Sequence, residues 1–309
     1  MVRRTLSHKS LMTPEAITHP ARSGNALGIA AMLASMAAFT ANDTCVKLIG
    51  NTLPLGELIV LRNAIASCYI LAFAAMFGGM TLPSNPPARL LGWRMVAEFF
   101  CTLFFLSGLV ALPIADATAI AQFAPLAITA AAAIFLKEPI GWRRWAAALA
   151  GLFGVLLITR PGSTAFQPAA LLTLASVAFI VLRDLTTRAI SGNVPTLTLT
   201  AMSATVSILA GVALLPFETW IIPSSTQLLY LAAGAFFLAI AYALIVIAMR
   251  NGDVGVVSPF RYAVILFAIL SGWLVWGELP DQIQMTGIAV LTAAGLYTFH
   301  REKILGTQR

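Results

Sequence analysis

Apolar segments of similar length follow one another along most of this chain, with short polar breaks between them. One helical crossing of a bilayer requires roughly 20 apolar residues. We predict ten such spans, at residues 25–49, 57–78, 90–111, 114–136, 143–159, 168–190, 196–216, 226–249, 254–277 and 282–300. They use almost the whole chain, which leaves no room for a soluble domain. The sequence therefore predicts an all-α membrane protein with ten transmembrane helices.

The composition excludes a water-soluble globular protein. Hydrophobic residues make up 59% of the 309 residues and charged residues only 10%, whereas soluble domains are about 45–50% apolar and 25% charged. The formal net charge is +7. It does not indicate a nucleic-acid partner, because the basic residues are scattered at the ends of spans rather than gathered on one face.

The breaks between spans contain proline and glycine clusters. The weakest break is Leu112–Pro113, where a single kinked helix is the alternative. Residues 1–24 are polar and basic, and we interpret them as a disordered cytosolic tail. The apolar segment that follows is longer than that of a signal peptide, roughly 7–15 residues. It also contains Asp43 and Lys47, so we predict it as the first transmembrane helix.

Lysine and arginine residues are distributed unevenly between the two sides of the predicted bundle. If the N-terminus is cytosolic, fourteen of them, including Arg94, fall in cytosolic segments and only Arg160 falls in an outer loop. Cytosolic loops of membrane proteins carry such an excess of basic residues. We predict a multi-pass protein of a bacterial inner membrane with both termini in the cytosol, residues 301–309 forming the C-terminal tail.

The two halves of the chain are similar in sequence. The segment LASMA at 33–37 matches LASVA at 174–178, an offset of 141 residues. The same offset pairs Asp43 with Asp184 and Lys47 with Arg188, and an offset of 140 pairs Glu138 with Glu278. Each half has five spans, an odd number, so the second half enters the membrane from the opposite side. The sequence predicts two inverted five-helix repeats, at 25–160 and 167–300.

Five segments carry a resemblance to a known family: ALPIADATAIAQFAPL (111–126), FLKEPIGWRRW (135–145), GLFGVLLITRPG (151–162), WGELP (276–280) and GIAVLTAAGL (287–296). In this order and spacing they resemble the drug/metabolite transporter superfamily, specifically its EamA-type members with two five-helix repeats. The resemblance covers roughly residues 25–300. The second half departs from the family pattern near Ile265, where it lacks a proline. The resemblance implies transport of amino acids, vitamins, nucleosides or similar solutes, often outward.

We therefore expect a secondary transporter that exports a small polar organic metabolite, such as an amino acid, by alternating access. The alternatives are an importer of a vitamin or nucleoside-like metabolite, and a channel or a flippase of a lipid-linked small molecule. ATP-driven transport is not expected, because the chain has no GxxxxGK phosphate loop. An enzyme is not expected either, because the three histidines, His8, His19 and His300, lie in the tail or at the end of the last span.

Charged residues within spans are the main candidates for function, since a charge at the bilayer centre costs roughly 2.5–3.5 kcal/mol on insertion scales. Four cations lie within spans: Lys47, Arg62, Arg183 and Arg261. Asp43 and Lys47 are four residues apart, hence on one helix face, as are Asp184 and Arg188. We expect either two symmetry-related gate ion pairs or interfacial pairs whose cations reach the membrane surface.

Arg62 and Glu98 lie in the second and third spans. Arg62 needs an acceptor, for which Glu57, Asp43 and Glu98 are candidates. It either binds a substrate carboxylate in bidentate fashion or ties two helices together. Glu98 either couples transport to protons or is the permanent partner of an arginine.

Arg261 and Tyr262 lie in the ninth span after Pro259, and Gln122 occupies the corresponding region of the fourth. We expect these groups to meet near the midplane and to contact the substrate. Arg261 is the best candidate for binding an anionic group, and a helix-end cation near the cytosolic interface is the alternative. At the start of the fourth span, Asp116 is expected to be an N-terminal cap or a partner of the helix dipole.

No cofactor and no metal site are expected. Cys45, Cys68 and Cys101 fit no metal motif and are interpreted as small buried hydrophobic residues. Glu138 and Glu278 follow spans closely and are interpreted as helix-end anchors. The expected partners are a small-molecule substrate and the lipid bilayer, with protons as the candidate coupling ion. The protein is expected to be a monomer or a weak homodimer.

Overall fold

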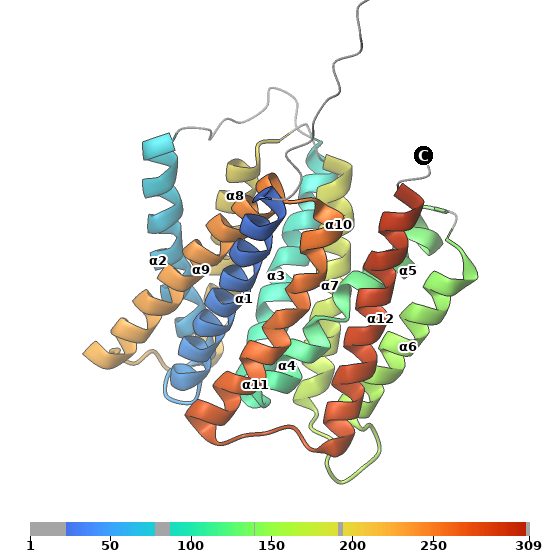
Figure 1. The fold of residues 1–309 in the computed structure, drawn as a ribbon. Coiled ribbons are helices and arrows are strands. Elements are labelled where there is room, and N and C mark those ends of the chain that lie inside the picture. Colours follow the sequence, from blue (N-terminus) through green and yellow to red (C-terminus); the bar gives the residue numbers. More distant parts are fainter. Residues whose placement is uncertain (1–22, 78–86, 139, 191–193, 307–309) are drawn as a thin grey trace, which may run out of the picture.

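The computed structural model describes residues 23–77, 87–138, 140–190 and 194–306 (Figure 1). All regular elements in these ranges are helices. Their bounds are α1 (Ser23–Gly50), α2 (Leu55–Phe77), α3 (Ala88–Ala111), α4 (Ile114–Ala121), α5 (Ala124–Phe135), α6 (Trp142–Thr159), α7 (Ala169–Ile190), α8 (Thr196–Val212), η1 (Leu215–Phe217), α9 (Ser225–Asn251), α10 (Val254–Val257), η2 (Ser258–Tyr262), α11 (Ala263–Trp276) and α12 (Gln282–Gly306).

The described part of the chain contains nine helical segments that are long and apolar enough to cross a membrane. They correspond to the first nine predicted spans. The tenth predicted span lies in α12, a helix of 25 residues that is not among the nine. Polar glutamines at its start and charged residues at its end lower its hydropathy. This helix continues to Gly306, so the helical part extends into the predicted tail at 301–309; residues 1–22 and 307–309 lie outside the described residues.

Two of the predicted spans are interrupted. The fourth consists of α4 and α5, which are separated at Gln122 and Phe123, and Pro125 lies in the first turn of α5. The ninth consists of α10, the 3-10 turn η2 with Pro259, and α11. Because proline has no N–H to donate, it interrupts the helical hydrogen-bond ladder at both places. The interruptions expose backbone carbonyls at corresponding places in the two halves.

The break at Leu112–Pro113 is confirmed, and the alternative of a single kinked helix is wrong. Leu112 has extended backbone angles, with φ −100° and ψ 160°. A residue before proline is driven out of the helical region by a steric clash with the proline ring. The chain therefore ends α3 and starts a separate helix, α4.

The helices of the two halves interdigitate. The most extensive contacts join α1 to α9, α3 to α7, α6 to α12, and α2 to α8, so each joins a helix of the first half to one of the second. The buried core also draws on both halves, with Met32, Leu109 and Ile265 among its fully buried side chains. Figure 1 shows that α1 begins at the end of the bundle where α12 finishes. We call this the terminal end, and the other the distal end.

Glycines allow the closest of these helix contacts. A Cβ atom on Gly154 of α6 would lie 2.7 Å from the carbonyl oxygen of Gly287 on α12, and one on Gly287 would lie 2.7 Å from the carbonyl oxygen of Gly154. A Cβ atom on Gly108 of α3 would overlap the side chain of Thr173 on α7. Small residues of this kind let helix backbones approach closely in membrane proteins.

Candidate functional site

A chain of polar contacts joins α2 to α1. Arg62 is buried and donates from Nε and Nη2 to Oδ1 of Asn42, at 3.2 and 3.1 Å. The amide nitrogen of Asn42 then donates to Oδ1 of Asp43 at 2.8 Å. Of the three acceptors expected for Arg62, Asp43 is reached through Asn42. Glu57 instead accepts from the backbone N–H of Ile221 at 3.0 Å.

Three charged groups meet between α3 and α7. Nε of Arg183 donates to Oδ1 of Asp184 at 2.9 Å, and Nη1 of Arg183 lies 4.0 Å from Oε1 of Glu98. Glu98 therefore has an arginine neighbour, as one of its two predicted roles requires. Its role in proton coupling stays a prediction.

Arg94 does not lie at a cytosolic helix end, as its place among the fourteen basic residues implied. It is buried in α3 and donates to the hydroxyl oxygens of Thr187 on α7 and Ser203 on α8, both at 2.9 Å. The side chain points into the bundle because two hydroxyl groups there accept its hydrogen bonds. The position of Arg94 in the sequence does not reveal these acceptors.

The two interrupted spans meet at Gln122, Arg261 and Tyr262. Nε2 of Gln122 donates to the carbonyl oxygen of Arg261 at 3.2 Å, and the hydroxyl of Tyr262 donates to the carbonyl oxygen of Gln122 at 3.4 Å. The structure thus brings these three predicted residues together. Their contacts satisfy carbonyls that the helix breaks leave free. Tyr262 is buried, and its hydroxyl occupies the space beside Gly295.

Unlike the side chains of Gln122 and Tyr262, the guanidinium of Arg261 has no hydrogen-bond partner among the described residues. The side chain is exposed, although it lies deep within the bundle, where it interacts electrostatically with Asp184 and Arg183. Among the described residues it forms neither an ion pair nor a side-chain hydrogen bond. Asp184 and Tyr242 combine depth with exposed surface in the same way. Arg183 interacts electrostatically with all three of these groups.

Aromatic rings pack together on the helices that carry these charged groups. Phe100 and Phe104 of α3 pack on Phe179 of α7, with ring centroids 5.0 and 5.7 Å away. The ring of Phe39 on α1 meets that of Tyr242 on α9 edge-on, at 5.3 Å. We call Asp43, Glu98, Arg183, Asp184, Tyr242 and Arg261 the central cluster.

Lys47 and Arg188 pair differently from the expectation. Lys47 binds Glu278 at 3.1 Å and the carbonyl oxygen of Leu112 at 2.7 Å, with its ammonium group 4.8 Å from the centre of the Trp276 ring. Arg188 binds Glu138 at 3.0 Å. The predicted pairings with Asp43 and Asp184 within one helix are therefore wrong. A neighbouring segment offers each cation a carboxylate in better position than the residue one turn earlier.

The observed pairs still follow the sequence repeat. Lys47 and Arg188 correspond between the halves, as do Glu278 and Glu138, and each pair joins one half to the other. Lys47 lies in the last turn of α1 and Arg188 in the last turn of α7. Figure 1 shows that α1 finishes at the distal end and α7 at the terminal end. The two pairs differ in exposure: the side chains are 7% and 40% exposed for Lys47 and Glu278, against 63% and 39% for Arg188 and Glu138.

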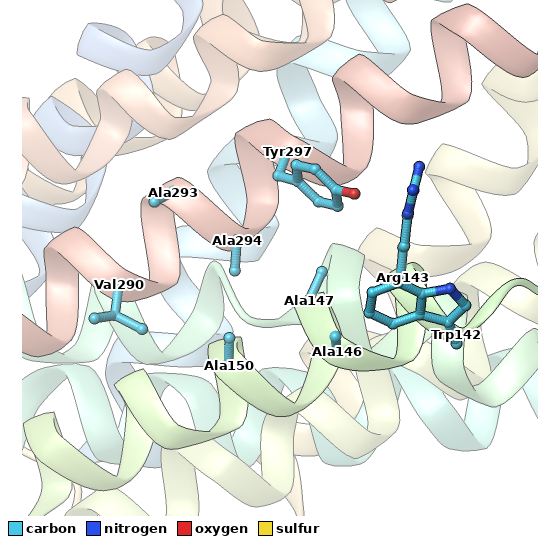
Figure 2. A pocket seen from close by; sticks show the side chains of 9 residues that line it. All are labelled: Trp142, Arg143, Ala146, Ala147, Ala150, Val290, Ala293, Ala294 and Tyr297. Atoms are coloured by element: carbon cyan, nitrogen blue, oxygen red, sulfur yellow. The ribbon is translucent and has the colours of Figure 1, made fainter.

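One pocket, of about 420 Å³, lies between α6 and α12 (Figure 2). Figure 2 shows alanines from both helices along its floor, with Trp142, Arg143 and Tyr297 at one side. None of the predicted site residues lines it. Its apolar lining gives a polar solute few partners, so we do not assign the substrate to it.

The described residues contain no group of three or more histidine, cysteine, aspartate or glutamate side chains that could hold a metal ion. Cys45 and Cys101 are buried, as expected, whereas Cys68 is exposed on α2. The prediction of a buried Cys68 is wrong because that face of α2 has no helix covering it.

Comparison with known proteins identifies the family. A model of the EamA-like transporter family matches the chain twice, at residues 26–160 and 167–299. The chain belongs to the EamA-like transporter family. The resemblance read from the sequence motifs is confirmed.

Several bacterial relatives of this EamA-like protein have assigned substrates. The S-adenosylmethionine uptake transporter of Rickettsia conorii is 26% identical over 89% of this chain and 93% of its own length. The riboflavin transporter of Rhizobium johnstonii is 30% identical over 77% of this chain and 78% of its own length. The pseudopaline exporter of Pseudomonas aeruginosa is 26% identical over 85% of this chain and 93% of its own length.

A solved crystal structure has the same fold, with a TM-score of 0.62 at 22% identity, over 90% of this chain and 98% of the other. The EamA-like protein is thus a multi-pass membrane transporter of small molecules. The family and the named relatives are transporters rather than enzymes.

Three members of the site were absent from the predicted set: Asn42, Tyr242 and Arg183. Arg183 was recognisable as an arginine within a span, directly before Asp184. Asn42 and Tyr242 are uncharged and carry no comparable signal. Only the packing of α1 against α2 and α9 places them beside the charges.

Proposed function

We propose that this EamA-like protein is a secondary transporter that works by alternating access and binds its solute at the central cluster. Arg261 carries the proposal. A guanidinium deep in a membrane protein requires a partner, yet Arg261 has none among the described residues and keeps exposed surface. An anionic group on the solute supplies that partner through charge-assisted hydrogen bonds.

The balance of charges in and beside the central cluster also favours an anionic group on the solute. Two arginines outside the central cluster lie beside it: Arg62 interacts with Asp43, and Arg94 with Glu98 and Asp184. Counted with them, Arg183 and Arg261 bring the positive charges to four, against three negative charges from Asp43, Glu98 and Asp184. The difference of one positive charge suits a solute with one excess negative group at the site. The carboxylates nearby accommodate a cationic group on the same molecule.

The aromatic residues favour a solute that also contains a flat ring. Phe100, Phe179 and Tyr242 offer ring faces and edges beside the charges, and rings stack on one another favourably. S-adenosylmethionine and riboflavin, which two relatives are named for, both contain a heteroaromatic ring. We therefore propose a ring-containing metabolite with a carboxylate or similar anionic group, in preference to a simple amino acid.

We further propose that ten transmembrane helices form two inverted repeats, with α12 as the tenth. The two family matches, one in each half, and the exchange of helix partners between halves support this arrangement. With the terminal end in the cytosol, the structure is closed to the outside, because Lys47 is buried at the distal end while Arg188 is exposed at the terminal end.

Transport direction depends on the solute gradient and any coupling ion. Relatives named for uptake and for export both exist, so the fold serves either direction. We propose uptake here, because the relatives named for ring-containing metabolites include an uptake transporter. This reverses the preference for export formed from the sequence.

Counterflow in proteoliposomes tests the proposal. Vesicles loaded with unlabelled S-adenosylmethionine or riboflavin receive labelled solute outside, with amino acids and organic acids as the comparison panel. We expect saturable uptake that the internal solute accelerates. Flux that rises linearly with concentration would indicate a channel instead, and counterflow only with simple amino acids would contradict the ring-containing substrate.

A further inference from the structure

Five charged side chains gather around the start of α4 at the distal end: Lys47, Asp116, Arg160, Glu278 and Asp281. We call them the distal cluster. Lys47 is paired with Glu278 at 3.1 Å, and Arg160 is paired with Asp281. They come from α1, α4, the end of α6 and the α11–α12 connection, so the cluster joins both halves where the structure is closed.

Asp116 is the unpaired member of the distal cluster. Its side chain is 6% exposed. Oδ2 accepts a hydrogen bond from Nε2 of Gln284 at 2.7 Å, while Oδ1 is buried and has no hydrogen-bond partner among the described residues. Both cations of the cluster are engaged by other carboxylates. Asp116 does not cap the helix, since Pro113 is the N-cap of α4 and no side-chain cap bond forms. It lies in the first turn of α4, where the other expected role, a partner of the helix dipole, requires it.

The charges of the distal cluster balance only if one carboxyl group is neutral. Lys47 and Arg160 contribute +2, and three ionised carboxylates would contribute −3, which leaves one excess negative charge; Asp116 is the buried carboxyl group of the three. Burying an uncompensated charge is far more costly than burying a neutral carboxylic acid. Glu278 and Asp281 each hold a cation and are more exposed than Asp116. Asp116 is therefore the group that should carry the proton.

We propose that Asp116 is a proton-binding site that closes the distal gate: the gate closes when this carboxylate takes up one proton, and it opens when the proton is lost. The proton comes from water on the distal side and binds at Oδ1. When the halves separate, water reaches Asp116, Lys47 and Arg160 lose their partners, and the carboxyl group releases its proton and ionises beside them. This inference rests on the alternating-access function proposed above.

Spin-label distance measurements on the full chain in lipid nanodiscs test the proposal. Labels at Asn51→Cys and Leu279→Cys, both exposed at the distal end, flank the Lys47–Glu278 pair. The three native cysteines are replaced in this parent protein. We expect a long-distance, open population that grows as the pH rises. Linkage to one proton allows the open-to-closed ratio to change by at most about tenfold per pH unit.

Two variants of that parent protein test whether Asp116 causes the pH dependence of the open population. Asp116→Asn mimics the protonated acid, so it should remain closed at every pH. Glu57→Gln is the matched control: Glu57 is also buried, has one carboxylate oxygen without a partner, and lies in the first turn of α2 outside the cluster. It should keep the pH dependence of the parent. The proposal is overturned if Asp116→Asn retains that dependence, or if the parent has none.

Infrared difference spectra of the unlabelled wild-type protein provide a measurement that does not depend on how well the variant folds. Acidification should add a protonated-carboxyl band coinciding with gate closure, and Asp116→Glu should shift that band. If acidification adds no such band to the wild type, the proposal fails. A pH-dependent distance without counterflow of any solute would contradict the proposed transport function and leave the proton site supported.

Discussion

Neighbouring residues can have opposite roles in this protein, and Arg261 and Tyr262 are the clearest case. The Tyr262 ring is buried and its hydroxyl contacts a backbone carbonyl of the interrupted fourth span. The preceding residue, Arg261, is exposed, and its side chain has no hydrogen-bond or ion-pair partner among the described residues. Since adjacent positions on a helical turn point in different directions, one residue holds the site together and the other meets the solute.

Replacement of Arg261 by glutamine should weaken solute binding. Hydrogen bonds to charged groups contribute about 1.5–3 kcal/mol, which corresponds to roughly a 10- to 100-fold rise in the KM for counterflow. Arg250→Gln removes an arginine from the exposed last turn of α9 and should leave KM unchanged. An equal effect of both variants would indicate a general electrostatic influence and contradict direct binding by Arg261.

Asp281 gives a pH-dependent prediction outside the membrane-spanning helices. Its carboxylate accepts from the backbone N–H of Gln284 and of Ile283, at 3.0 and 2.9 Å. The hydrogen bond from Gln284 is the main cause that lowers its pKa below the ordinary 3.8, and Arg160 lowers it further. A carboxylate whose pKa is lowered on folding stabilises the protein above about pH 4, and this stabilisation is lost as the pH falls below that value.

We expect Asp281→Ala to lower the free energy of unfolding by about 1 kcal/mol at neutral pH, as loss of a helix N-cap does. The difference from wild type should shrink below about pH 4. Thermal unfolding in detergent at several pH values measures it. Asp281→Asn keeps a capping oxygen but not the charge, so its free energy of unfolding should lie between those of the wild type and Asp281→Ala. If the difference between Asp281→Ala and the wild type grows in acid, Asp281 does not stabilise the protein as a charged helix cap.

At the scale of helices, the structure depends on connections between the halves rather than within them. Each half places its own helices against helices of the other, and the two ion pairs Lys47–Glu278 and Arg188–Glu138 cross the same boundary. Interrupted helices in corresponding positions of both halves meet at Gln122 and Arg261. Such an arrangement allows one half to move against the other with the central cluster between them.

Reversal of the distal pair tests its specificity. Lys47→Glu leaves two carboxylates facing each other and should abolish counterflow or reduce it at least about tenfold, because it places a second negative charge in the buried position of Lys47 beside Glu278. The double exchange Lys47→Glu with Glu278→Lys should recover part of the activity. No recovery in a well-expressed double variant would show that Lys47 acts through Leu112 and Trp276 rather than through Glu278.

The contact between α6 and α12 should tolerate no side chain at Gly154. A leucine there would overlap the backbone of α12 around Gly287 and should lower the midpoint of thermal unfolding by several degrees. Overpacking of this kind typically costs about 1–3 kcal/mol. Gly141→Leu is the control, because nothing lies within 4 Å of a Cβ atom at that position. Equal stability of the two variants would contradict the close helix contact.

For the whole molecule, the proposed orientation places the terminal end in the cytosol and the distal end outside. Basic residues are concentrated in segments assigned to the terminal end, as the positive-inside rule requires. The same orientation makes the Lys47–Glu278 pair, in which Lys47 is buried, the outer closure. The exposed Arg188–Glu138 pair then lies toward the cytosol.

Cysteine labelling in intact cells tests this orientation. In a cysteine-free protein, a cysteine at Ser163, exposed in the α6–α7 connection, should react with an impermeant reagent added outside. A cysteine at Asn251, exposed at the end of α9, should react only after permeabilisation. The reverse pattern would invert the orientation and assign the distal cluster to the cytosolic side.

The membrane-spanning segments and the helix break at Leu112–Pro113 could be predicted from the sequence because they depend on local properties of the chain. Apolar length determines which segments can cross a bilayer, and Leu112–Pro113 ends a helix through a local clash. The repeat and the motifs led to the EamA-like family. The residues Gln122, Arg261 and Tyr262 were expected to meet because they lie in corresponding regions of the fourth and ninth spans, and the structure brings them together.

Only the tertiary structure determined which charges meet. Spacing within one helix suggested Lys47 with Asp43 and Arg188 with Asp184, whereas each cation binds a carboxylate from the other half. Its position predicted that Asp116 is a helix cap or a partner of the helix dipole, and it does lie in the first turn of α4. Only the packing shows that it is also a buried carboxyl group without an ion-pair partner in the distal cluster. Electrostatic energy depends on distance and burial in three dimensions, and neither is a property of neighbouring positions in the chain. The sequence by itself thus determined the helices, and their packing decided the chemistry between them.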